Sequence, residues 1–163
     1  MAYPKVAAEV FAAVSPANNQ KLKQDIAKVQ AVKAGYDEAI LLSPQGHVSE
    51  CTGENLFVVR DGTIVTPPTS AGALAGITQD CVRRIAGDLG IPYVQGNLLR
   101  SDLYTADEAF LSGTAAEVVP IRSVDDRVIG DPGPITRQVQ EVFFQAVRGE
   151  RPEYSEWNDH VDA

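Results

Sequence analysis

The chain has 163 residues, enough for one domain with a hydrophobic core, and its 44% apolar and 22% charged content is typical of globular proteins. Its formal net charge of −8 argues against non-specific binding to nucleic acid or an anionic membrane, and no apolar run approaches the roughly 20 residues of a membrane span. Two cysteines, Cys51 and Cys81, are too few for a disulfide framework, so a cytoplasmic protein with free thiols is expected.

The first half of the chain alternates between a helix and short strands. Apolar residues at helical spacing predict a helix over residues 18–34, with Leu22, Ile26 and Val29 on its buried face. A buried strand is expected directly afterwards, in the run EAILLS. Two further apolar runs meet around Asp61-Gly62, which is the strongest hairpin signal in the sequence.

The second half adds two amphipathic helices separated by short strands. Residues 77–89 predict the first of these helices, and its apolar stripe comprises Ile77, Cys81, Ile85 and Leu89. Strands are expected in the runs IPYVQ and EAFLSGT and on both sides of Asp125-Asp126. The last helix begins at Pro134 and extends to about Val147, with these side chains inward: Ile135, Val139, Val142, Phe143 and Ala146.

This mixture of elements predicts a single α/β or α+β domain over residues 1–163. Its body is expected at 18–149, between a divergent N-terminal segment at 1–17 and a polar tail at 150–163. Tyr154 and Trp157 are the large apolar side chains of the tail, and we expect them to dock against the body.

Three segments carry residue types that suit a charged ligand, the first two an anion and the third a cation. Gly76 precedes Ile77 and Thr78 at a helix start, where free N–H groups and a hydroxyl can bind a phosphate. In the run FLSGTAAE, small residues and two hydroxyls follow a strand and let the backbone approach a ligand. Glu50 and Glu54 flank a third turn, where a carboxylate can pair with a cationic ring nitrogen or an arginine. An ordinary helix start, a tight turn and a surface loop are the structural alternatives.

Taken together, the three segments resemble the fold type IV, or class IV, aminotransferases that use pyridoxal 5′-phosphate, and most closely branched-chain amino acid aminotransferase. The matching stretches cover about residues 34–147 and are AGYDEAILLSPQGHVSECTGENLFVVRDGTIVTPP, ALAGITQDCVRRIAGDLGI and LYTADEAFLSGTAAEVVPIRSVDDRVIGDPGPITRQVQEVFF. The resemblance implies the family's large C-terminal domain. In that domain a mixed, mainly antiparallel sheet or pseudobarrel is flanked by helices, here near 19–34, 77–89 and 134–148.

The resemblance also implies roles for individual residues. Glu50 matches the glutamate opposite the pyridine nitrogen, where it keeps that nitrogen protonated so that the ring accepts electrons. Glu54 and Asn55 are expected to shape the loop. The phosphate cup comprises Ile77, Thr78, Gly113 and Thr114, with Ala115 as a further candidate. The implied substrates are an amino acid and a 2-oxo acid.

The sequence departs from the family pattern in four respects. Cys51 stands where glycine is usual, and Gln79 replaces an arginine. The Schiff-base lysine of the family's K-x-x-GNY segment falls at Pro16, which leaves Lys21 and Lys23 as weak candidates. All five lysines lie within the first 33 residues, so any primary-amine chemistry must come from there or from the N-terminus. The family's smaller N-terminal domain is also missing from the sequence.

Three functions remain open at this stage. The chain is a truncated branched-chain-aminotransferase-like cofactor domain with low activity alone. Alternatively, it is an active transaminase or lyase that uses Lys21 or Lys23 in an oligomer, or a non-enzymatic phosphate-ligand-binding or interaction domain. Half a cleft exposes apolar surface, so we expect a homodimer, a larger homo-oligomer or a partner chain that completes the cleft. No metal-ligand spacing occurs, and His47 and His160 are isolated.

Overall fold

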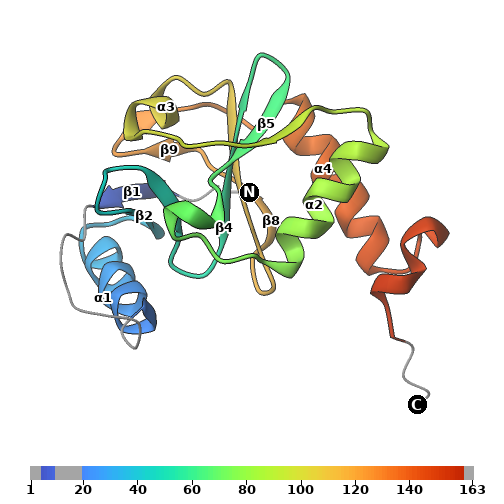
Figure 1. Ribbon diagram of the computed structural model, residues 1–163, viewed down its shortest axis with the longest axis horizontal. Coiled ribbons are helices and arrows are strands. Elements are labelled where there is room, and N and C mark those ends of the chain that lie inside the picture. The colour runs from blue at the N-terminus through green and yellow to red at the C-terminus, as the bar shows by residue number, and fades with distance from the viewer. Residues whose placement is uncertain (1–4, 10–19, 160–163) are drawn as a thin grey trace.

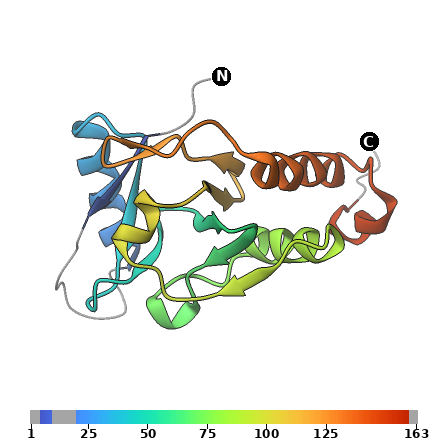
Figure 2. The same ribbon diagram turned by 90° about the horizontal axis from the view of Figure 1, so that it is seen from above.

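The computed structural model describes residues 5–9 and 20–159 and has four layers (Figures 1 and 2). Two five-stranded sheets pack face to face. Helix α1 (Gln20–Lys33) lies on the outer face of the first sheet. Helices α2 (Ile77–Asp88) and α4 (Pro134–Val147) lie side by side on the outer face of the second. The mixed α/β fold and all three long helices predicted from the sequence are confirmed.

The first sheet has a parallel centre. Its strands, in spatial order, are β10 (Arg127–Val128), β9 (Ser123–Val124), β1 (Lys5–Glu9), β2 (Glu38–Leu42) and β3 (Val48–Cys51). Strand β1 pairs in parallel with both β9 and β2. The five residues KVAAE of β1 carry no clear alternation of apolar and polar side chains, so their pattern did not predict a strand. The segment considered divergent therefore supplies the central strand of this sheet.

The second sheet is mainly antiparallel. Its strands, in spatial order, are β6 (Tyr93–Gln95), β5 (Thr63–Thr66), β4 (Asn55–Arg60), β7 (Glu108–Gly113) and β8 (Glu117–Pro120). The predicted hairpin joins β4 to β5 through Asp61 and Gly62, whose φ angles of 49° and 74° suit a tight two-residue turn. Three short helical segments complete the described part of the chain: η2 (Thr69–Ala71), α3 (Arg100–Tyr104) and η3 (Pro152–Trp157).

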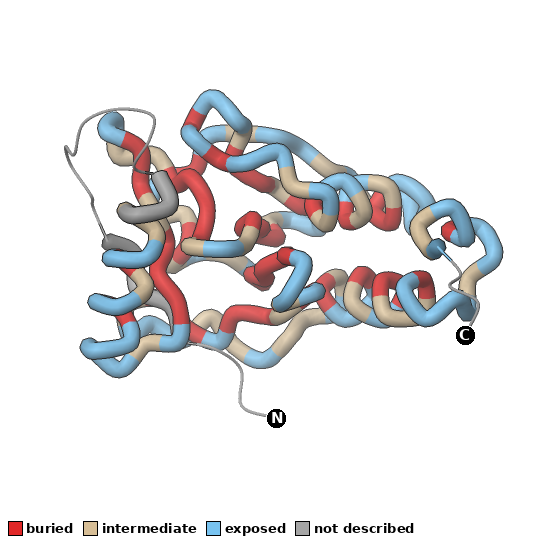
Figure 3. The backbone as a smooth tube through the Cα atoms, turned by 90° about the horizontal axis from the view of Figure 1, so that it is seen from below, coloured by how far each residue is buried: buried red, intermediate tan, exposed pale blue. Residues whose placement is uncertain are grey.

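Strand β4 is buried on both faces and separates two hydrophobic cores. Leu56 and Val58 point into the core between the sheets, whereas Phe57 and Val59 point toward α2 and α4. The pairing of β4 with β7 places Phe57 opposite Phe110, and their rings stack with centroids 4.7 Å apart. Figure 3 shows the buried strands between helices whose outer faces are exposed. The predicted inward face of α4 is confirmed, since Val139, Val142, Phe143 and Ala146 are buried and Ile135 packs against them.

The predicted buried stripe of α1 is wrong. Ile26 and Val29 are 42% and 53% exposed, and Leu22 lies outside the residues whose side chains the structure describes. The buried face is instead formed by Ala27 and Ala31, which pack against β2. Small side chains let the helix approach the strand closely, and periodicity of large apolar residues does not detect such a contact.

The predicted stripe of α2 is only partly right. Ile85 is buried and Cys81 is half-buried, but Ile77 is 85% exposed and Leu89 also faces solvent. The buried face comprises Gln79, Val82, Ile85 and Ala86. Because Gln79 is polar, its place in the core was not expected from the hydrophobic pattern.

The two aromatic residues of the predicted polar tail dock on α2, as expected. The Tyr154 hydroxyl donates to Asp88 Oδ2 over 2.8 Å, and its ring stacks on Trp157 at a centroid distance of 4.5 Å. The Arg84 guanidinium lies over both rings and also pairs with Glu156. Among the described helices, none combines the length and the apolar composition needed to cross a membrane.

Helix α4 is anchored to the second sheet by a buried carboxyl group. Glu108, on β7, accepts the N–H groups of Ile135 and Thr136 over 3.1 and 2.7 Å. These groups have no partner within the helix, and a carboxylate at a helix N-terminus also complements the helix dipole. We therefore expect Glu108→Ala to lower the free energy of unfolding by about 1–3 kcal/mol. Chemical denaturation measures this loss.

The matched control is Glu141→Ala, an exposed residue of the same helix. Its expected change is within about 0.5 kcal/mol. Equal losses in the two variants would show that Glu108 does not anchor α4.

Candidate functional site

Two cavities open on either side of the N-terminus of α2. The smaller one, of about 540 Å³, is named the glutamate cavity because Glu50, Glu54 and their turn form one wall. Its remaining lining comes from Gln24 on α1, from the stretch between Leu74 and Thr78, and from Ser112, Gly113 and Thr114. The structure thus brings together Glu50, Ile77, Thr78, Gly113 and Thr114, five of the predicted site residues. Ala115 follows in the same turn but does not line the cavity.

Glu50 is a buried carboxyl group held from two sides. It sits on β3 with 4% of its surface exposed. Gln24 Nε2, on α1, donates to Oε1 over 3.0 Å, and the Leu74 N–H donates to Oε2 over 2.7 Å. These bonds fix the carboxyl group at the cavity wall. Sequence analysis did not single out Gln24 or Leu74, since no local pattern connects either residue with Glu50.

The start of α2 forms the opposite wall. Gly76 is the N-cap residue and supplies no side-chain cap, so the first N–H groups of the helix remain available to a ligand. The Asn55 side chain packs against Gly76 and donates to Leu74 O over 2.8 Å. An added Cβ at Gly76 would lie 2.1 Å from Asn55 Oδ1. A side chain at position 76 would therefore displace the Asn55 amide group.

The turn after β7 approaches the Glu54 turn closely. A Cβ on Gly113 would lie 3.0 Å from Gly53 O and 3.1 Å from Glu54 Cγ. Ser112 is paired with Asn55 across β4 and β7 and is fully buried. Its hydroxyl lacks a hydrogen-bond partner among the described residues, although it belongs to the cavity lining. A buried polar atom of this kind is often satisfied by a ligand or by water.

A second carboxyl cluster lies behind the cavity wall. Glu38, on β2, accepts hydrogen bonds from Lys28, from the Ala39 N–H and from the Thr52 hydroxyl. Burial and the neighbouring carboxyl group of Glu38 raise the pKa of Glu54 to about 7. Sequence analysis noted Glu54 but not Glu38, because the two residues are adjacent only in the folded chain.

The two residues that depart from the family motifs, Cys51 and Gln79, are both buried, and each also borders a cavity. Cys51 is fully buried in the core between the sheets, and burial raises the pKa of its thiol well above the usual value. Gln79 is also buried, and its Nε2 donates to Thr66 Oγ1 over 3.3 Å. Both side chains therefore serve packing in this fold.

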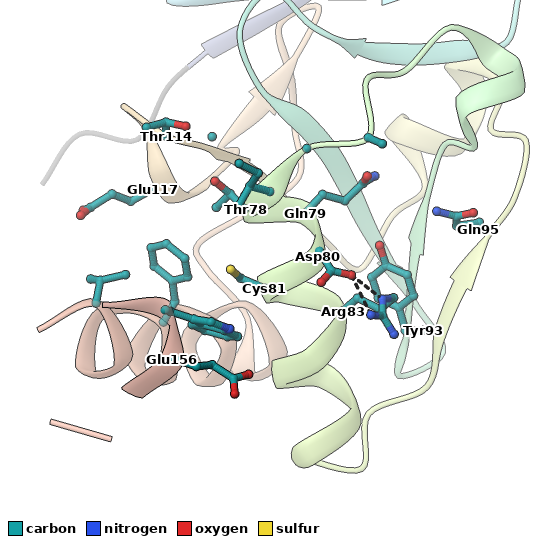
Figure 4. A pocket seen from close by; sticks show the side chains of 17 residues that line it. Thr78, Gln79, Asp80, Cys81, Arg83, Tyr93, Gln95, Thr114, Glu117 and Glu156 are labelled. Atoms are coloured by element: carbon teal, nitrogen blue, oxygen red, sulfur yellow. Dashed lines mark hydrogen bonds and ion pairs between the residues drawn. The ribbon is translucent and has the colours of Figure 1, made fainter. Parts of the chain in front are cut away.

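The larger cavity, of about 950 Å³, lies between α2, α4 and η3 (Figure 4). It shares the α2 start and the Gly113–Thr114 turn with the glutamate cavity, but Glu50 does not line it. Phe143, Val147 and Trp157 give it an apolar wall. Asp80, Arg83, Glu117 and Glu156 also line it, but it lacks Glu50 and the Glu54 turn, which is why we assign the candidate site to the glutamate cavity.

No lysine occurs among the described residues that line the glutamate cavity. Lys23 is half-buried on α1 but is not part of the lining. Lys28 is engaged with Glu38 Oε2 and with Asp37 O, at 2.7 and 2.6 Å. Pro16 lies outside the described residues, as does the Lys21 side chain. Within the described part of the chain, no group of three His, Cys, Asp or Glu residues is arranged to hold a metal ion.

Comparison with known proteins identifies a family. Residues 17–124 match the model of the amino-transferase class IV family. A probable branched-chain-amino-acid aminotransferase of Aquifex aeolicus (strain VF5) is 47% identical over 135 residues, which cover 81% of this chain and 43% of that protein. The branched-chain-amino-acid aminotransferase of Escherichia coli (strain K12) is 45% identical over 135 residues, or 82% of this chain and 44% of that protein.

Solved structures agree with this assignment. The branched-chain amino acid aminotransferase of T.th., complexed with N-(5′-phosphopyridoxyl)-L-glutamate, superposes with a TM-score of 0.91 at 42% identity. The match covers 98% of this chain and 57% of that one. An archaeal relative from Thermoproteus uzoniensis, with norvaline, gives a TM-score of 0.89 at 42% identity over 95% of this chain and 55% of that one. The chain thus spans less than two thirds of these relatives.

The close packing of Asn55 against Gly76 at the start of α2 predicts different effects of alanine at Gly76 and at Gly87, which lies within the same helix. Gly76→Ala forces the Asn55 side chain to move and breaks its bond to Leu74 O. The expected loss is about 1–3 kcal/mol in the free energy of unfolding. Chemical denaturation measures it.

Gly87→Ala is the matched control, because a Cβ there meets nothing within 4 Å and the position is exposed within α2. This variant should gain about 0.5–1 kcal/mol, since alanine favours the helix. A Gly76→Ala protein as stable as the original chain would contradict the packing argument.

Proposed function

The chain belongs to the class IV aminotransferase family as a branched-chain-aminotransferase-like domain, and we propose that its glutamate cavity binds pyridoxal 5′-phosphate. The observation that carries the proposal is the convergence of a buried carboxyl group with an uncapped helix start and a hydroxyl-bearing turn on one cavity. Pyridoxal phosphate has a phosphate group at one end and a cationic ring nitrogen at the other. The helix start and the hydroxyl-bearing turn suit the phosphate, and the carboxyl group suits the ring nitrogen.

The donor set supports a phosphate at the α2 end of the cavity. The N–H groups of Ile77 and Thr78 and the hydroxyl of Thr114 would hold it. A side chain at Gly113 would crowd the neighbouring turn, and the buried Ser112 hydroxyl has no hydrogen-bond partner among the described residues. Ala115 would contribute only through its backbone. These residues fit the phosphate group.

Glu50 would hold a proton on the ring nitrogen. Gln24 and the Leu74 N–H each donate a hydrogen bond to one of the Glu50 carboxyl oxygens, which sets the orientation of the carboxyl group. A carboxylate in this orientation needs little rearrangement to accept a hydrogen bond from a cationic ring N–H. When bound, pyridoxal phosphate supplies an electron-accepting ring that stabilises negative charge on the Cα atom of an amino acid. The relatives are branched-chain aminotransferases by name, so branched-chain amino acids and their 2-oxo acids are the proposed substrate class.

Binding by this chain alone should be weak. The described lining of the cavity contains neither lysine nor arginine, so a phosphate dianion would be held by N–H dipoles and hydroxyl groups without a cation. The overall charge of −8 opposes the ligand further. We therefore propose a cofactor-binding domain with low activity on its own. Activity through Lys21 or Lys23 is the alternative, and a non-enzymatic phosphate-ligand-binding or interaction domain is a third.

The experiment is a titration with pyridoxal 5′-phosphate, followed by borohydride reduction and peptide mass spectrometry. We expect reversible binding, seen as a shift of the cofactor absorbance, without an adduct on one specific lysine. Glu50→Gln should weaken binding about tenfold or more, because it removes a charged hydrogen bond.

Glu141→Gln, an exposed change outside the cavity, controls for the altered net charge and should bind like the original chain. A specific adduct on Lys21 or Lys23 would support the active enzyme instead. Failure to bind pyridoxal phosphate at all would rule out both enzyme-derived functions and leave the interaction domain.

We propose in addition that the chain self-associates through the mouth of its cavities. Ile77 and Leu74 border the glutamate cavity and are 85% and 67% exposed, an unusual exposure for large apolar side chains. Light scattering should report a dimer or a larger homo-oligomer, and Ile77→Ser should shift it toward the monomer. Val128→Ser, at a distant exposed position of β10, is the control and should leave the mass unchanged. A monomer at working concentration would contradict this proposal.

A further inference from the structure

Helix α1 presents its larger apolar side chains to solvent. Ile26, Val29 and Val32 recur at every third position and are 42%, 53% and 55% exposed, and we name them the outer stripe. The opposite face of the helix carries Ala27 and Ala31, which are fully buried. Figure 1 shows α1 at the edge of the molecule, where its main packing partners among the described elements, β1 and β2, lie on the alanine side.

The fold of a single chain does not account for the outer stripe. Isoleucine and valine are β-branched and favour a helix less than alanine or lysine does. On an exposed face they also leave apolar surface in water, although burial of that surface would be favourable. Three neighbouring apolar side chains on an exposed helical face are typical of a helix that packs against a second molecule. The outer stripe is therefore a candidate interface.

The outer face of α1 is symmetric about Val29. Ile26 lies three residues before it and Val32 three residues after it. Asp25 and Lys33, which are both exposed, lie four residues before and four residues after it. Because a helix turns by about 100° per residue, all four positions fall within about 60° of Val29 around the helix axis. The face thus has apolar residues in its middle and opposite charges at its two ends.

A surface of this kind is complementary to a copy of itself in antiparallel orientation. When two α1 helices pair about a two-fold axis at Val29, Ile26 lies level with Val32 of the second copy. Asp25 then lies level with Lys33 of the second copy, and the symmetry repeats this pair. A parallel pair would instead place like charges side by side. Within one helix the two charged residues are about 12 Å apart along the axis, which is too far for them to pair with each other.

The charges also decide which occupant the face selects. Asp25 has an interaction within its own chain, and a carboxylate can accept a hydrogen bond from a further donor. One acidic and one basic residue give the outer face no net charge, so it does not select a strongly acidic or a strongly basic partner. A second copy of the chain supplies both charges in the order that antiparallel pairing requires.

We propose that two copies of this chain associate through an antiparallel contact between their α1 helices, with the two-fold axis at Val29. A contact made by one helix face buries less area than the roughly 1,200 Å² of a standard interface, so the dimer is weak and dissociates on dilution. The surface is separate from the mouth of the cavities, because α1 lines the glutamate cavity through Gln24, on the opposite side of the helix. The proposal therefore does not rest on the proposed function.

Disulfide cross-linking tests the register of the contact. The parent variant is Cys81→Ser, because the other native thiol, Cys51, is fully buried. Val29→Cys should form a disulfide-linked dimer under mild oxidation with oxidised glutathione, since both copies of this residue lie on the axis. Ile26→Cys is the matched control and should not cross-link, because its two copies are about 9 Å apart along the helices. A mixture of Ile26→Cys and Val32→Cys should form the mixed dimer.

A charge swap tests the orientation of the two helices. Sedimentation equilibrium between about 10 µM and about 1 mM measures the dimer in an Ile77→Ser background, which removes association through the mouth of the cavities. Asp25→Lys and Lys33→Asp should each weaken the dimer about tenfold, because each turns two attractive pairs into two repulsive ones. The double variant should restore it. The single variants change the net charge in opposite directions, so net charge cannot explain a loss in both. Gln30→Ser, about 100° away from Val29 on the same helix, is the control and should leave the dimer unchanged.

Three results would overturn the proposal. Equal cross-linking of Val29→Cys and Ile26→Cys would contradict the position of the axis. Single charge variants that dimerise like their parent would contradict the antiparallel pairing, and a monomer at the highest concentration would contradict the contact itself. None of these measurements involves pyridoxal phosphate, so the cofactor titration alone decides the proposed function.

Discussion

The pairing of β4 with β7 is the constraint on which the candidate site depends. It places Asn55 opposite Ser112 at the end of both strands, so that the turn before β4 and the turn after β7 leave the sheet at the same edge. Asn55 then binds Leu74 O and packs against Gly76, which fixes the start of α2 above that edge. A shift of one residue in this register would turn Asn55 toward the opposite core and separate the three walls of the cavity.

Much of the fold follows from local signals that act independently of one another. The Asp61-Gly62 hairpin, the Asp125-Asp126 turn and the glycines after the first two helices take the positive φ angles that their residue types favour. The three segments that form the candidate site were recognisable in the sequence because each has small or hydroxyl-bearing residues at the end of a helix or strand. The structural features that the sequence did not predict depend on contacts between residues that are far apart in the chain. Two alanines form the buried face of α1, and a glutamine lies on the buried face of α2. A short strand near the N-terminus, β1, completes the first sheet by pairing with the strands on either side of it. The bond from Gln24 to Glu50 spans 26 residues and has no local signature.

Three acidic side chains are buried in the described part of the fold, Glu50 at the cavity, Glu38 on β2 and Glu108 at the start of α4, and their burial is possible because each finds a specific donor. Glu50 uses an amide side chain and a backbone N–H, Glu38 uses a lysine, a hydroxyl and a backbone N–H, and Glu108 uses the start of α4. Unpaired, each would cost several kcal/mol of stability. Donors of this kind are fixed by the fold, so the carboxyl groups remain in position without a ligand. A site built in this way favours a cationic ring at the Glu50 end, whereas the phosphate end depends on N–H dipoles.

The proposed binding residues and the lysines lie in different parts of this sequence. The proposed ligand-binding residues lie between positions 50 and 115, on β3, at the start of α2 and around the end of β7, while all five lysines lie before residue 34. The walls of the cavity are therefore held by contacts that do not involve any lysine, with the exception of the Lys28–Glu38 pair behind them. A lysine that reacts at the ring must be placed to within a fraction of an ångström, whereas a phosphate can be held by several groups that tolerate small displacements. Loss or displacement of the reactive amine would accordingly remove catalysis long before it removed the fold or the cavity. This asymmetry is why membership of the family does not by itself assign this chain the activity of its longer relatives.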